Sequence, residues 1–349
     1  EMSKNPRWIV YLLILIGLLF IPRILSIYTL MLFEYGLTFA IVGLGFNLLL
    51  GYTGLLSFGH GAYFAAGAYS VAMIGKYFPK AYSLEILIPA ALFFSLVLSV
   101  IFGFVCVRHT KIFFSILTLS LSMLLFALLF KLYHITGGSD GLRVPLPALF
   151  GMSFKGIRRP EFLSGTYYYF LLIMFAVSFL VMKGIVGSPF GKALQAIRDN
   201  EVRAELIGIR VRRYRLYAFI ISGLFVGLGG ALWTFVNGHV TADLSHWVFS
   251  GEIVYMTLLG GFGIFEGPII GAMIFTYLKL YAMGNTQYWM FVIGATLIVL
   301  VMLLPNGVAG AVSSLWTKIN PVRNSSGALA AQALAQRGII SNGVKKKSD

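Results

Sequence analysis

Long runs of apolar residues, separated by short polar stretches, follow one another along most of this chain. Each run is about 15 to 25 residues long, the length that an α-helix needs to cross roughly 30 Å of hydrocarbon. Ten-residue segments of alternating polarity, the pattern of a membrane β-barrel, are absent from the sequence. The pattern predicts an all-α polytopic membrane protein with about ten transmembrane helices. The predicted spans are approximately residues 8–22, 28–50, 57–76, 84–107, 112–133, 166–183, 215–236, 248–262, 267–283 and 289–304.

Composition supports this prediction. The chain is 58% hydrophobic and 11% charged, with a mean hydropathy of +0.87, whereas soluble domains are about 25% charged. Its net charge of +15 would suggest nucleic acid as a partner of a soluble protein, but most of the basic residues lie between the spans. Since Lys and Arg mark the cytoplasmic loops of membrane proteins, we expect membrane lipid as a partner and no nucleic acid. The single cysteine, Cys106, excludes an internal disulfide and a thiolate metal cluster.

Basic charge also predicts the orientation. Segment 184–214 and its edges carry eight basic and three acidic residues, so this segment and both termini are predicted to be cytoplasmic (N-in/C-in). The segment 134–165 then becomes a structured external loop, although it contains four basic residues. We predict a transmembrane domain over residues 1–310 and a flexible basic cytoplasmic tail over residues 311–349.

Glycines and polar residues interrupt the apolar stretch "LGFNLLLGYTGLLSFGHGA" (44–62). A series of small residues such as Gly223, Gly227 and Ala231 is explained by close helix packing. The stretch 44–62, however, has five glycines together with Asn47, Ser57 and His60. Non-helical backbone in a membrane is tolerated only when it is buried in protein or faces a water-filled cavity. The stretch is therefore predicted to line or hinge a path for a polar solute. Its candidate residues are Asn47, Gly51, Gly54, Ser57, Gly59 and His60. Alternatively, the histidine is bonded to neighbouring backbone at the membrane edge.

A second stretch resembles the first. "LLGYTGLLSFGHGA" (49–62) and "LLGGFGIFEGPIIGA" (258–272) share their LLG and G-x-x-G spacing, with one residue of slippage. Paired glycine-interrupted segments in the two halves of a chain indicate a transporter's working site, although glycine-rich membrane segments also resemble one another by chance. Ionisable groups in spans are costly and thus functional candidates; Glu34 and Glu252 are of this kind, unless each bonds another helix. The second stretch adds Glu252, Gly260, Gly261 and Gly263 to the predicted pathway or hinge.

Signatures of enzymes and metal sites are not found. The nearest approach to a P-loop is "GSPFGKA" (187–193), which is one residue short and has Ala193 at the position of the metal-binding hydroxyl. The five histidines lack close ligand spacing, and no G-x-S-x-G motif occurs. We therefore predict neither a catalytic residue nor a metal site, and no cofactor in this chain.

The predicted cytoplasmic segment has the signals of two short amphipathic helices within about residues 188–210. Ser188 and Pro189 suit the start of the first helix. Asn200 can cap the second, and Gly208 lies near its end. Acidic residues among the arginines favour a protein partner; the alternative is an element that lies on anionic lipid.

Three blocks of the sequence resemble the permeases of bacterial ABC importers for branched-chain amino acids, in particular their M-type permease subunit. They are "GFNLLLGYTGLLSFGHGAYFAAGAY" (45–69), "SPFGKALQAIRDNEVRAELIGIRVRRYRLYAFIISGLFVGLGGAL" (188–232), and "LLGGFGIFEGPIIGA" with "MLLPNGVAG" (258–272 and 302–310). The resemblance covers about residues 35–310. It implies that "RDNEVRAELIG" is a coupling loop that docks on an ATPase subunit. Glu201, Ala204 and Gly208 match the family pattern loosely, with Val202 and Arg203 intervening. The coupling candidates are Ala196, Arg198, Asp199, Asn200, Glu201, Arg203, Ala204, Glu205 and Gly208.

The same resemblance implies the assembly. We expect a heterodimer with a homologous permease, two ABC ATPase subunits that bind ATP and Mg, and a periplasmic solute-binding protein, located in the bacterial inner membrane. The expected cargo is a branched-chain or related small amino acid, with urea or amides as further possibilities. The alternative is a stand-alone secondary transporter or channel for small polar solutes, for which Glu34 and Glu252 are the supporting residues. A membrane-embedded enzyme lacks a catalytic constellation.

Overall fold

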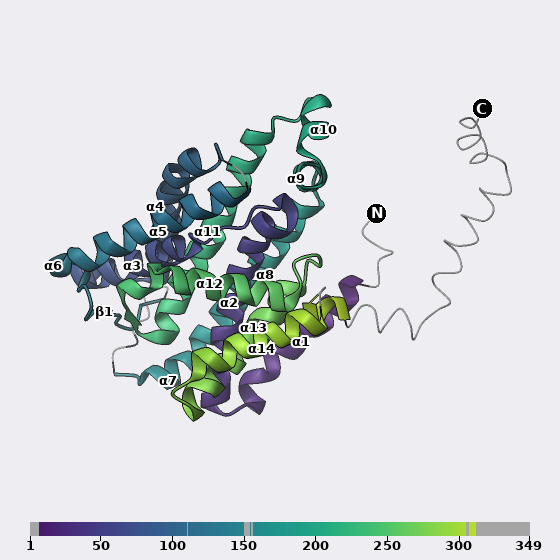
Figure 1. Cartoon of the computed structure of the whole chain (residues 1–349). Coiled ribbons are helices and arrows are strands. Elements are labelled where there is room, and N and C mark those ends of the chain that lie inside the picture. The colour runs from purple at the N-terminus through teal and green to yellow at the C-terminus, as the bar shows by residue number, and fades with distance from the viewer. Residues whose placement is uncertain (1–6, 110, 150–153, 155, 305–306, 312–349) are drawn as a thin grey trace, which may run out of the picture.

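The computed structural model describes residues 7–109, 111–149, 154, 156–304 and 307–311 of the chain, and Figure 1 shows a bundle of helices. The α-helices are α1 (Arg7–Ile24), α2 (Ile27–Thr53), α3 (His60–Tyr77), α4 (Leu84–Cys106), α5 (Lys111–Lys131), α6 (Tyr133–Thr136), α7 (Arg159–Phe162), α8 (Tyr168–Gly187), α9 (Pro189–Asp199), α10 (Glu201–Leu206), α11 (Val211–Asn237), α12 (Trp247–Gly260), α13 (Gly267–Asn285) and α14 (Trp289–Leu303). The shorter elements are η1 (Pro79–Ala81), η2 (Leu163–Tyr167), η3 (Ala242–Ser245) and the strands β1 (Leu142–Arg143) and β2 (His239–Val240).

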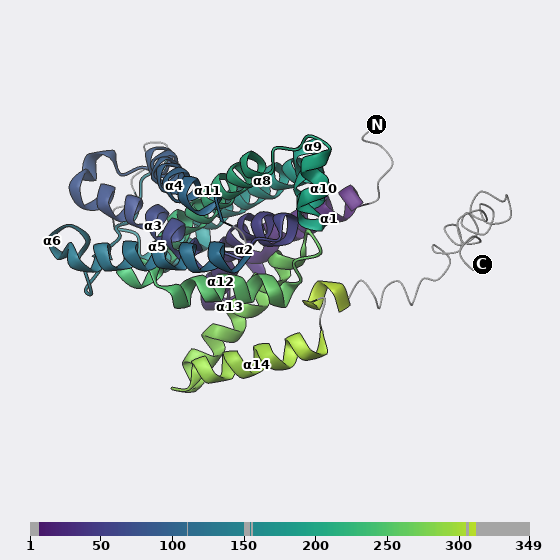
Figure 2. The ribbon, with the colours of Figure 1, turned by 45° about the horizontal axis from the view of Figure 1, so that its top comes forward.

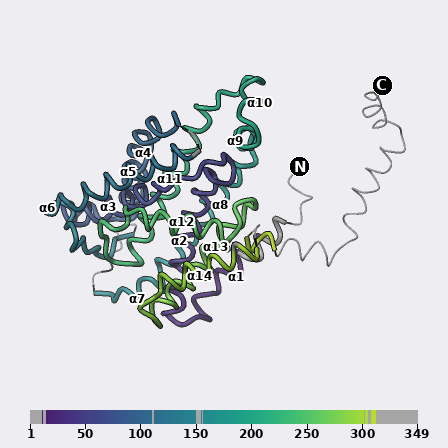
Figure 3. The backbone as a smooth tube through the Cα atoms, viewed as in Figure 1, coloured from purple at the N-terminus to yellow at the C-terminus, as the bar shows by residue number. Residues whose placement is uncertain are grey.

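A helix lies on each of the predicted spans, and the path of the chain through them can be followed in Figure 3. Within the described part of the chain, five helical segments are long and apolar enough to cross a membrane, namely Ile27–Thr53, Leu84–Cys106, Ile112–Lys131, Arg159–Gly187 and Val211–Asn237. The chain is thus a mostly helical, multi-pass membrane protein. Helices such as α12 are shorter than a typical span, so the total of ten crossings and the N-in/C-in orientation stay predictions.

Two 27-residue helices, α2 and α11, form the centre of the bundle. They pack on each other, and α11 also packs on α3 and α4. The small-residue series of α11 allows this approach: a Cβ added to Gly227 would lie 1.9 Å from Ser95 Oγ, and one added to Gly67 would lie 1.9 Å from Gly227 O. The predicted packing role of Gly223, Gly227 and Ala231 is confirmed, since these residues are buried among neighbouring helices.

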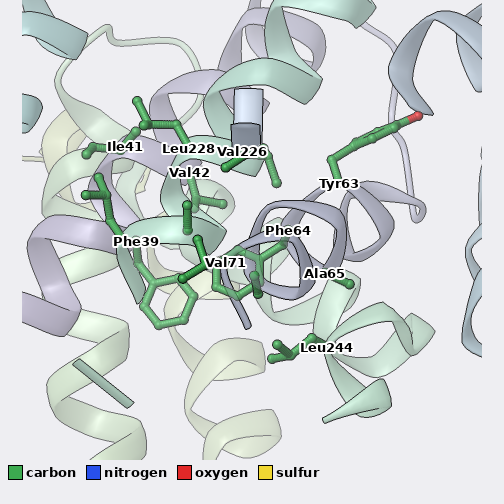
Figure 4. Close-up of a cluster of buried hydrophobic side chains, with 14 of the residues drawn as sticks. Phe39, Ile41, Val42, Tyr63, Phe64, Ala65, Val71, Val226, Leu228 and Leu244 are labelled. Carbon is green, nitrogen blue, oxygen red and sulfur yellow. The ribbon is translucent and has the colours of Figure 1, made fainter. Parts of the chain in front are cut away.

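Apolar side chains of these central helices form the main core. Figure 4 shows part of it, with Phe39 and Val42 from α2, Phe64 from α3 and Val226 from α11. The rings of Phe39 and Phe64 stack at a centroid distance of 5.9 Å. A second, smaller cluster beneath α9 and α10 includes Leu194. The outer helices, by contrast, expose many large apolar side chains, as expected of helices that face lipid.

The elements outside the spans lie at two ends of the bundle. In Figures 1 and 2, α9 and α10 are on the right with the start of α1, and α6 is on the left; Figure 1 shows β1 on the same left side. The predicted external loop 134–165 contains α6, β1, α7 and part of η2, and β1 pairs antiparallel with β2. Arg159 ties this end together, because its guanidinium donates to Phe235 O (2.7 Å) and Val144 O. The predicted tail lies outside the described residues, apart from Ala311.

The last described long helix, α14, stands apart from the body of the bundle. Figure 2 shows it below α12 and α13, which are the helices that it contacts. Its sequence is apolar on all sides, and Phe291 and Met302 are 77% and 79% exposed. Such a helix needs an apolar environment outside this chain, either lipid or another membrane subunit.

Candidate functional site

The predicted pair of amphipathic helices is present as α9 and α10, and we call it the α9–α10 pair. Pro189 is the first residue of α9 as predicted, but the Ser188 hydroxyl donates to Ile185 O (2.6 Å) instead of capping the helix. Asn200 does cap α10: its Oδ1 accepts from the backbone N of Arg203 at 2.9 Å. Gly208 has a φ of +89°, a left-handed conformation that suits glycine just beyond a helix end.

A buried arginine anchors α10 to α11. The Arg215 guanidinium donates to both carboxylate oxygens of Glu201, at 2.7 and 2.8 Å. The Arg215 side chain is 7% exposed and that of Glu201 is 41% exposed. A partly exposed carboxylate thus pairs with a buried guanidinium. Sequence analysis counted Arg215 only as a basic loop residue. Fourteen residues separate the partners, and no periodicity of a single helix joins them.

Large apolar side chains are exposed on α10 and at its C-terminal end, beside the charged Arg203 and Glu205. Val202, Leu206 and Ile207 are 68%, 82% and 70% exposed, although sequence analysis placed none of them among the coupling candidates. Beside them is an open pocket of about 470 Å³, lined by Phe190, Ile207, Gly208, Ile209, Arg210, Arg213, Tyr214 and Tyr217. Exposed apolar side chains rimmed by charge are typical of a protein docking surface.

The coupling candidates themselves are distributed over this surface and its underside. Arg198, Asp199, Asn200, Arg203, Glu205 and Gly208 are exposed, Ala196 and Glu201 are half-buried, and Ala204 is buried. Ala204 belongs to the small cluster that seats the α9–α10 pair on the bundle. The candidates therefore form one surface with one anchoring residue, at one end of the molecule.

Arg198 connects this surface to the first glycine stretch. Its guanidinium donates to Gly51 O in the last turn of α2, where backbone carbonyls lack partners within the helix. Gly54, with a φ of +72°, ends α2, and a Cβ on it would lie 3.0 Å from Arg198 Cγ. The predicted coupling segment and the predicted hinge thus touch each other directly.

The first glycine stretch is a true interruption, since residues 54–59 form a non-helical segment between α2 and α3. We call it the first break. Its walls are close: a Cβ on Gly59 would lie 2.4 Å from Thr118 O in α5. The prediction that glycines here break the helical ladder is confirmed, and close backbone contact explains Gly59.

His60, the first residue of α3, is fully buried directly after the first break. Its Nδ1 lies 2.9 Å from Ser57 Oγ and its Nε2 lies 2.8 Å from Ser222 Oγ of α11. The ring also packs edge-on against Phe46, with 4.9 Å between centroids. The alternative of a histidine satisfied by backbone at the membrane edge is therefore wrong in its detail, because two serine hydroxyls satisfy a fully buried ring. Asn47 is buried near Gly51, and its Oδ1 has no partner among the described residues.

The second glycine stretch forms a matching second break, residues 261–266 between α12 and α13. Gly261 ends α12 with a φ of +99°, as Gly54 ends α2. A Cβ on Gly260 would lie 2.0 Å from Gly267 O, whereas Gly263 is exposed with open space around it. The second break contacts the last turn of α2, just before the first break, since a Cβ on Gly51 would lie 2.6 Å from Phe262 O.

The two carboxylates that sequence analysis singled out differ in their surroundings. Glu252 in α12 is ion-paired to Lys279 in α13, a residue that sequence analysis missed, with Nζ 2.7 and 2.6 Å from the two carboxylate oxygens. Glu34 is fully buried in α2, and neither of its oxygens has a hydrogen-bond partner in the described part of the chain. Glu252 lies nine residues before the first residue of the second break, about 14 Å along a helix, so the structure does not bring it to the breaks.

The long apolar helices and the close glycine contacts between them define a multi-pass membrane protein. Two breaks interrupt its helices, and Arg198 of the α9–α10 pair contacts the end of α2 at the first break. The family model described as "branched-chain amino acid transport system / permease component" matches residues 28–301. The chain therefore belongs to this family of transport permeases.

Individual relatives agree with this assignment. The chain is 27% identical over 286 residues to the high-affinity branched-chain amino acid transport system permease protein LivM of Escherichia coli, covering 77% of this chain and 67% of that protein. It is 24% identical over 294 residues to the permease protein LivH of Salmonella typhimurium, covering 79% and 92%. A shorter match, 28% over 141 residues, is to the ribose import permease protein RbsC of Haemophilus influenzae, covering 38% and 43%. No solved structure matches the chain.

Proposed function

We propose that this chain is the membrane-spanning permease subunit of an ATP-driven ABC importer and forms part of the translocation pathway for branched-chain or related small amino acids. The observation that carries the proposal is the α9–α10 pair, which presents Val202, Leu206 and Ile207 to the outside and is anchored through Glu201 and Arg215. Acidic as well as basic residues surround these apolar side chains, which favours a protein partner over the surface of anionic lipid.

Family membership supports the wider assembly. We place the chain in the bacterial inner membrane, with ten spans, both termini inside and a cytoplasmic tail after residue 310. Its partners are a homologous permease, two ABC ATPases and a periplasmic binding protein. ATP and Mg bind in the ATPases, and this chain supplies the surface on which one of them docks.

The coupling route runs through backbone and side-chain contacts. Closure of the ATPase pair displaces the α9–α10 pair, and Arg198 transmits the displacement to Gly51 at the end of α2. The backbone of Gly51 packs against the carbonyl oxygen of Phe262 in the second break. A displacement of Gly51 therefore moves the second break together with the first. Such coupling works only because ATP and the loaded binding protein prefer different states of the permease.

Co-purification tests the proposal. A tagged chain extracted from native membranes is expected to bring a second permease and P-loop ATPases, identified by mass spectrometry and an ATPase assay. Glu201→Lys places a cation against Arg215 and is expected to release the ATPases, whereas Glu161→Lys at the opposite end serves as the control. A chain that comes out alone and moves solute into liposomes without ATP would establish the stand-alone carrier instead.

A further inference from the structure

The ion pair between Glu252 and Lys279 lies apart from the coupling route and has no role in it. The Lys279 ammonium contacts both oxygens of Glu252, and the two side chains are 23% and 10% exposed, respectively. An ion pair in a membrane segment is costly to bury, and replacing such a pair by apolar residues is often neutral for stability. Retention of charge at this place therefore calls for a functional explanation.

Holding α12 against α13 is a poor explanation. These helices already meet through backbone contacts, since a Cβ on Gly271 would lie 2.0 Å from Met256 O and one on Gly260 would lie 2.0 Å from Gly267 O. Such close packing positions the two helices without a charge pair.

The surroundings of the pair are arranged for a polar ligand. Thr276 lies one turn before Lys279 on the same face of α13, and its buried Oγ1 has no hydrogen-bond partner in the part of the chain that the structure describes. The ring of Trp289 lies 5.5 Å from Lys279 Nζ. Trp289 also lines an open pocket of about 500 Å³ together with Met283, which lies one turn beyond Lys279.

On the basis of the importer function above, we propose that Glu252 and Lys279 form a recognition site for the zwitterionic backbone of the amino-acid cargo. The cargo ammonium replaces Lys279 on the Glu252 carboxylate, and the cargo carboxylate takes Lys279 and accepts a hydrogen bond from Thr276. Every charge then keeps a partner of opposite sign, so the exchange avoids the large penalty of an unpaired charge in an apolar environment.

The exchange also explains selection. A free amine occupies Glu252 but leaves Lys279 unpaired, and a free carboxylic acid does the reverse. The pair therefore favours a ligand that carries an ammonium group and a carboxylate on the same carbon atom. The apolar side chain of the cargo lies towards Trp289 and Met283.

ATP-driven uptake of L-leucine into proteoliposomes that hold the complete complex tests this site. The double variant Glu252→Gln/Lys279→Met leaves no orphan charge, and Arg158→Gln/Glu161→Gln removes an exposed ion pair as the matched control. Since the same binding protein is used throughout, a difference in uptake arises in the permease. We expect the Glu252/Lys279 double variant to lose about tenfold or more of its leucine uptake, the effect of losing one charge-assisted hydrogen bond. Hydrolysis of ATP stimulated by the binding protein should persist.

The outcomes are distinguishable. Wild-type uptake by an assembled double variant overturns the recognition site and leaves the importer function standing. A wild-type complex that neither hydrolyses ATP nor moves leucine overturns the importer function itself. If the double variant assembles poorly, the exchange variant Glu252→Lys/Lys279→Glu tests the recognition site instead. This variant keeps the ion pair between α12 and α13 but places the carboxylate, and not the ammonium, on the helix that carries Thr276. Assembly with uptake below about a tenth of wild type supports the site, and full uptake overturns it.

Discussion

The two breaks have the same length and the same kind of glycine at their start, yet their interiors differ. At the end of the first break, Ser57 and Ser222 hold the fully buried ring of His60, the first residue of α3. In the second break, Phe262 and Gly263 are exposed. The Tyr11 hydroxyl of α1 donates a hydrogen bond to the carboxylate of Glu266 and so links the second break to α1. A sequence repeat thus gives one break that is locked by buried polar contacts and one that is half open.

This difference gives each break a distinct part in the account. The first break is followed by the buried, hydrogen-bonded His60 and touches the α9–α10 pair through Arg198 and Gly54, so it is suited to receive a displacement as a unit. The second break touches the end of α2 through Phe262 and exposes Phe262 and Gly263, so it is suited to change its conformation. Substitutions in and around the two breaks test this difference.

Gly59 and Gly263 form the first matched pair. Gly59→Leu forces side-chain atoms against the backbone of Thr118 and is expected to destabilise the protein by about 3 kcal/mol or more and to abolish transport. Gly263→Ala meets open space and is expected to change stability by less than about 0.5 kcal/mol. Thermal stability in detergent, followed by size-exclusion chromatography, measures both. Equal tolerance of the two changes would contradict the contrast.

Ser222 tests the polar lock on His60. Ser222→Ala leaves a buried ring nitrogen without its partner, which is expected to cost about 2 kcal/mol. Ser222→Thr keeps the hydroxyl and serves as the control for hydrogen bonding. The same thermal assay checks the result, and an Ser222→Ala protein as stable as wild type would show that the lock is unimportant.

Gly261 tests backbone strain in the second break. Its φ of +99° is rarely adopted by residues with a side chain, so Gly261→Ala is expected to cost about 1 kcal/mol or more. Transport should fall further than stability, because the second break changes shape in the proposed transport cycle. Uptake that declines only in proportion to the amount of folded protein would argue against a moving second break.

Tyr11 gives the smallest effect. Tyr11→Phe removes the hydroxyl that donates to Glu266 at 2.5 Å in a part-buried position, and we expect a loss of about 1 kcal/mol. The loss should be smaller than that of Ser222→Ala. The reverse order in the thermal assay would mean that the second break, and not the first, is the locked one.

Much of this arrangement could be predicted from local sequence signals. Apolar run length placed the helices, Asn200 and Gly208 marked the ends of α10, and glycine density marked both breaks, because each of these features depends on residues close in the chain. Local signals did not predict the partners that tertiary packing brings together. Arg215 for Glu201, Lys279 for Glu252 and Ser222 for His60 lie 14, 27 and 162 residues from their partners.

The exposure of the apolar side chains of α10 could not be predicted from the sequence for a different reason. An amphipathic pattern indicates that one side of a helix is apolar but not whether that side faces the core. Ala204 is the residue that faces inward, and Val202 and Leu206 face out. The pattern alone favoured burial of the larger side chains, since burying them is the usual way to remove apolar surface from water.

Arg198 joins the α9–α10 pair to the end of α2 and the start of the first break. The most direct test of this coupling contact is the ratio of leucine transported to ATP hydrolysed in proteoliposomes that hold the Arg198→Ala variant. The exposed Lys192→Ala serves as the control. Loss of this charge-assisted hydrogen bond is expected to lower the ratio about tenfold while hydrolysis and ATPase association persist. A ratio equal to that of wild type would contradict the account.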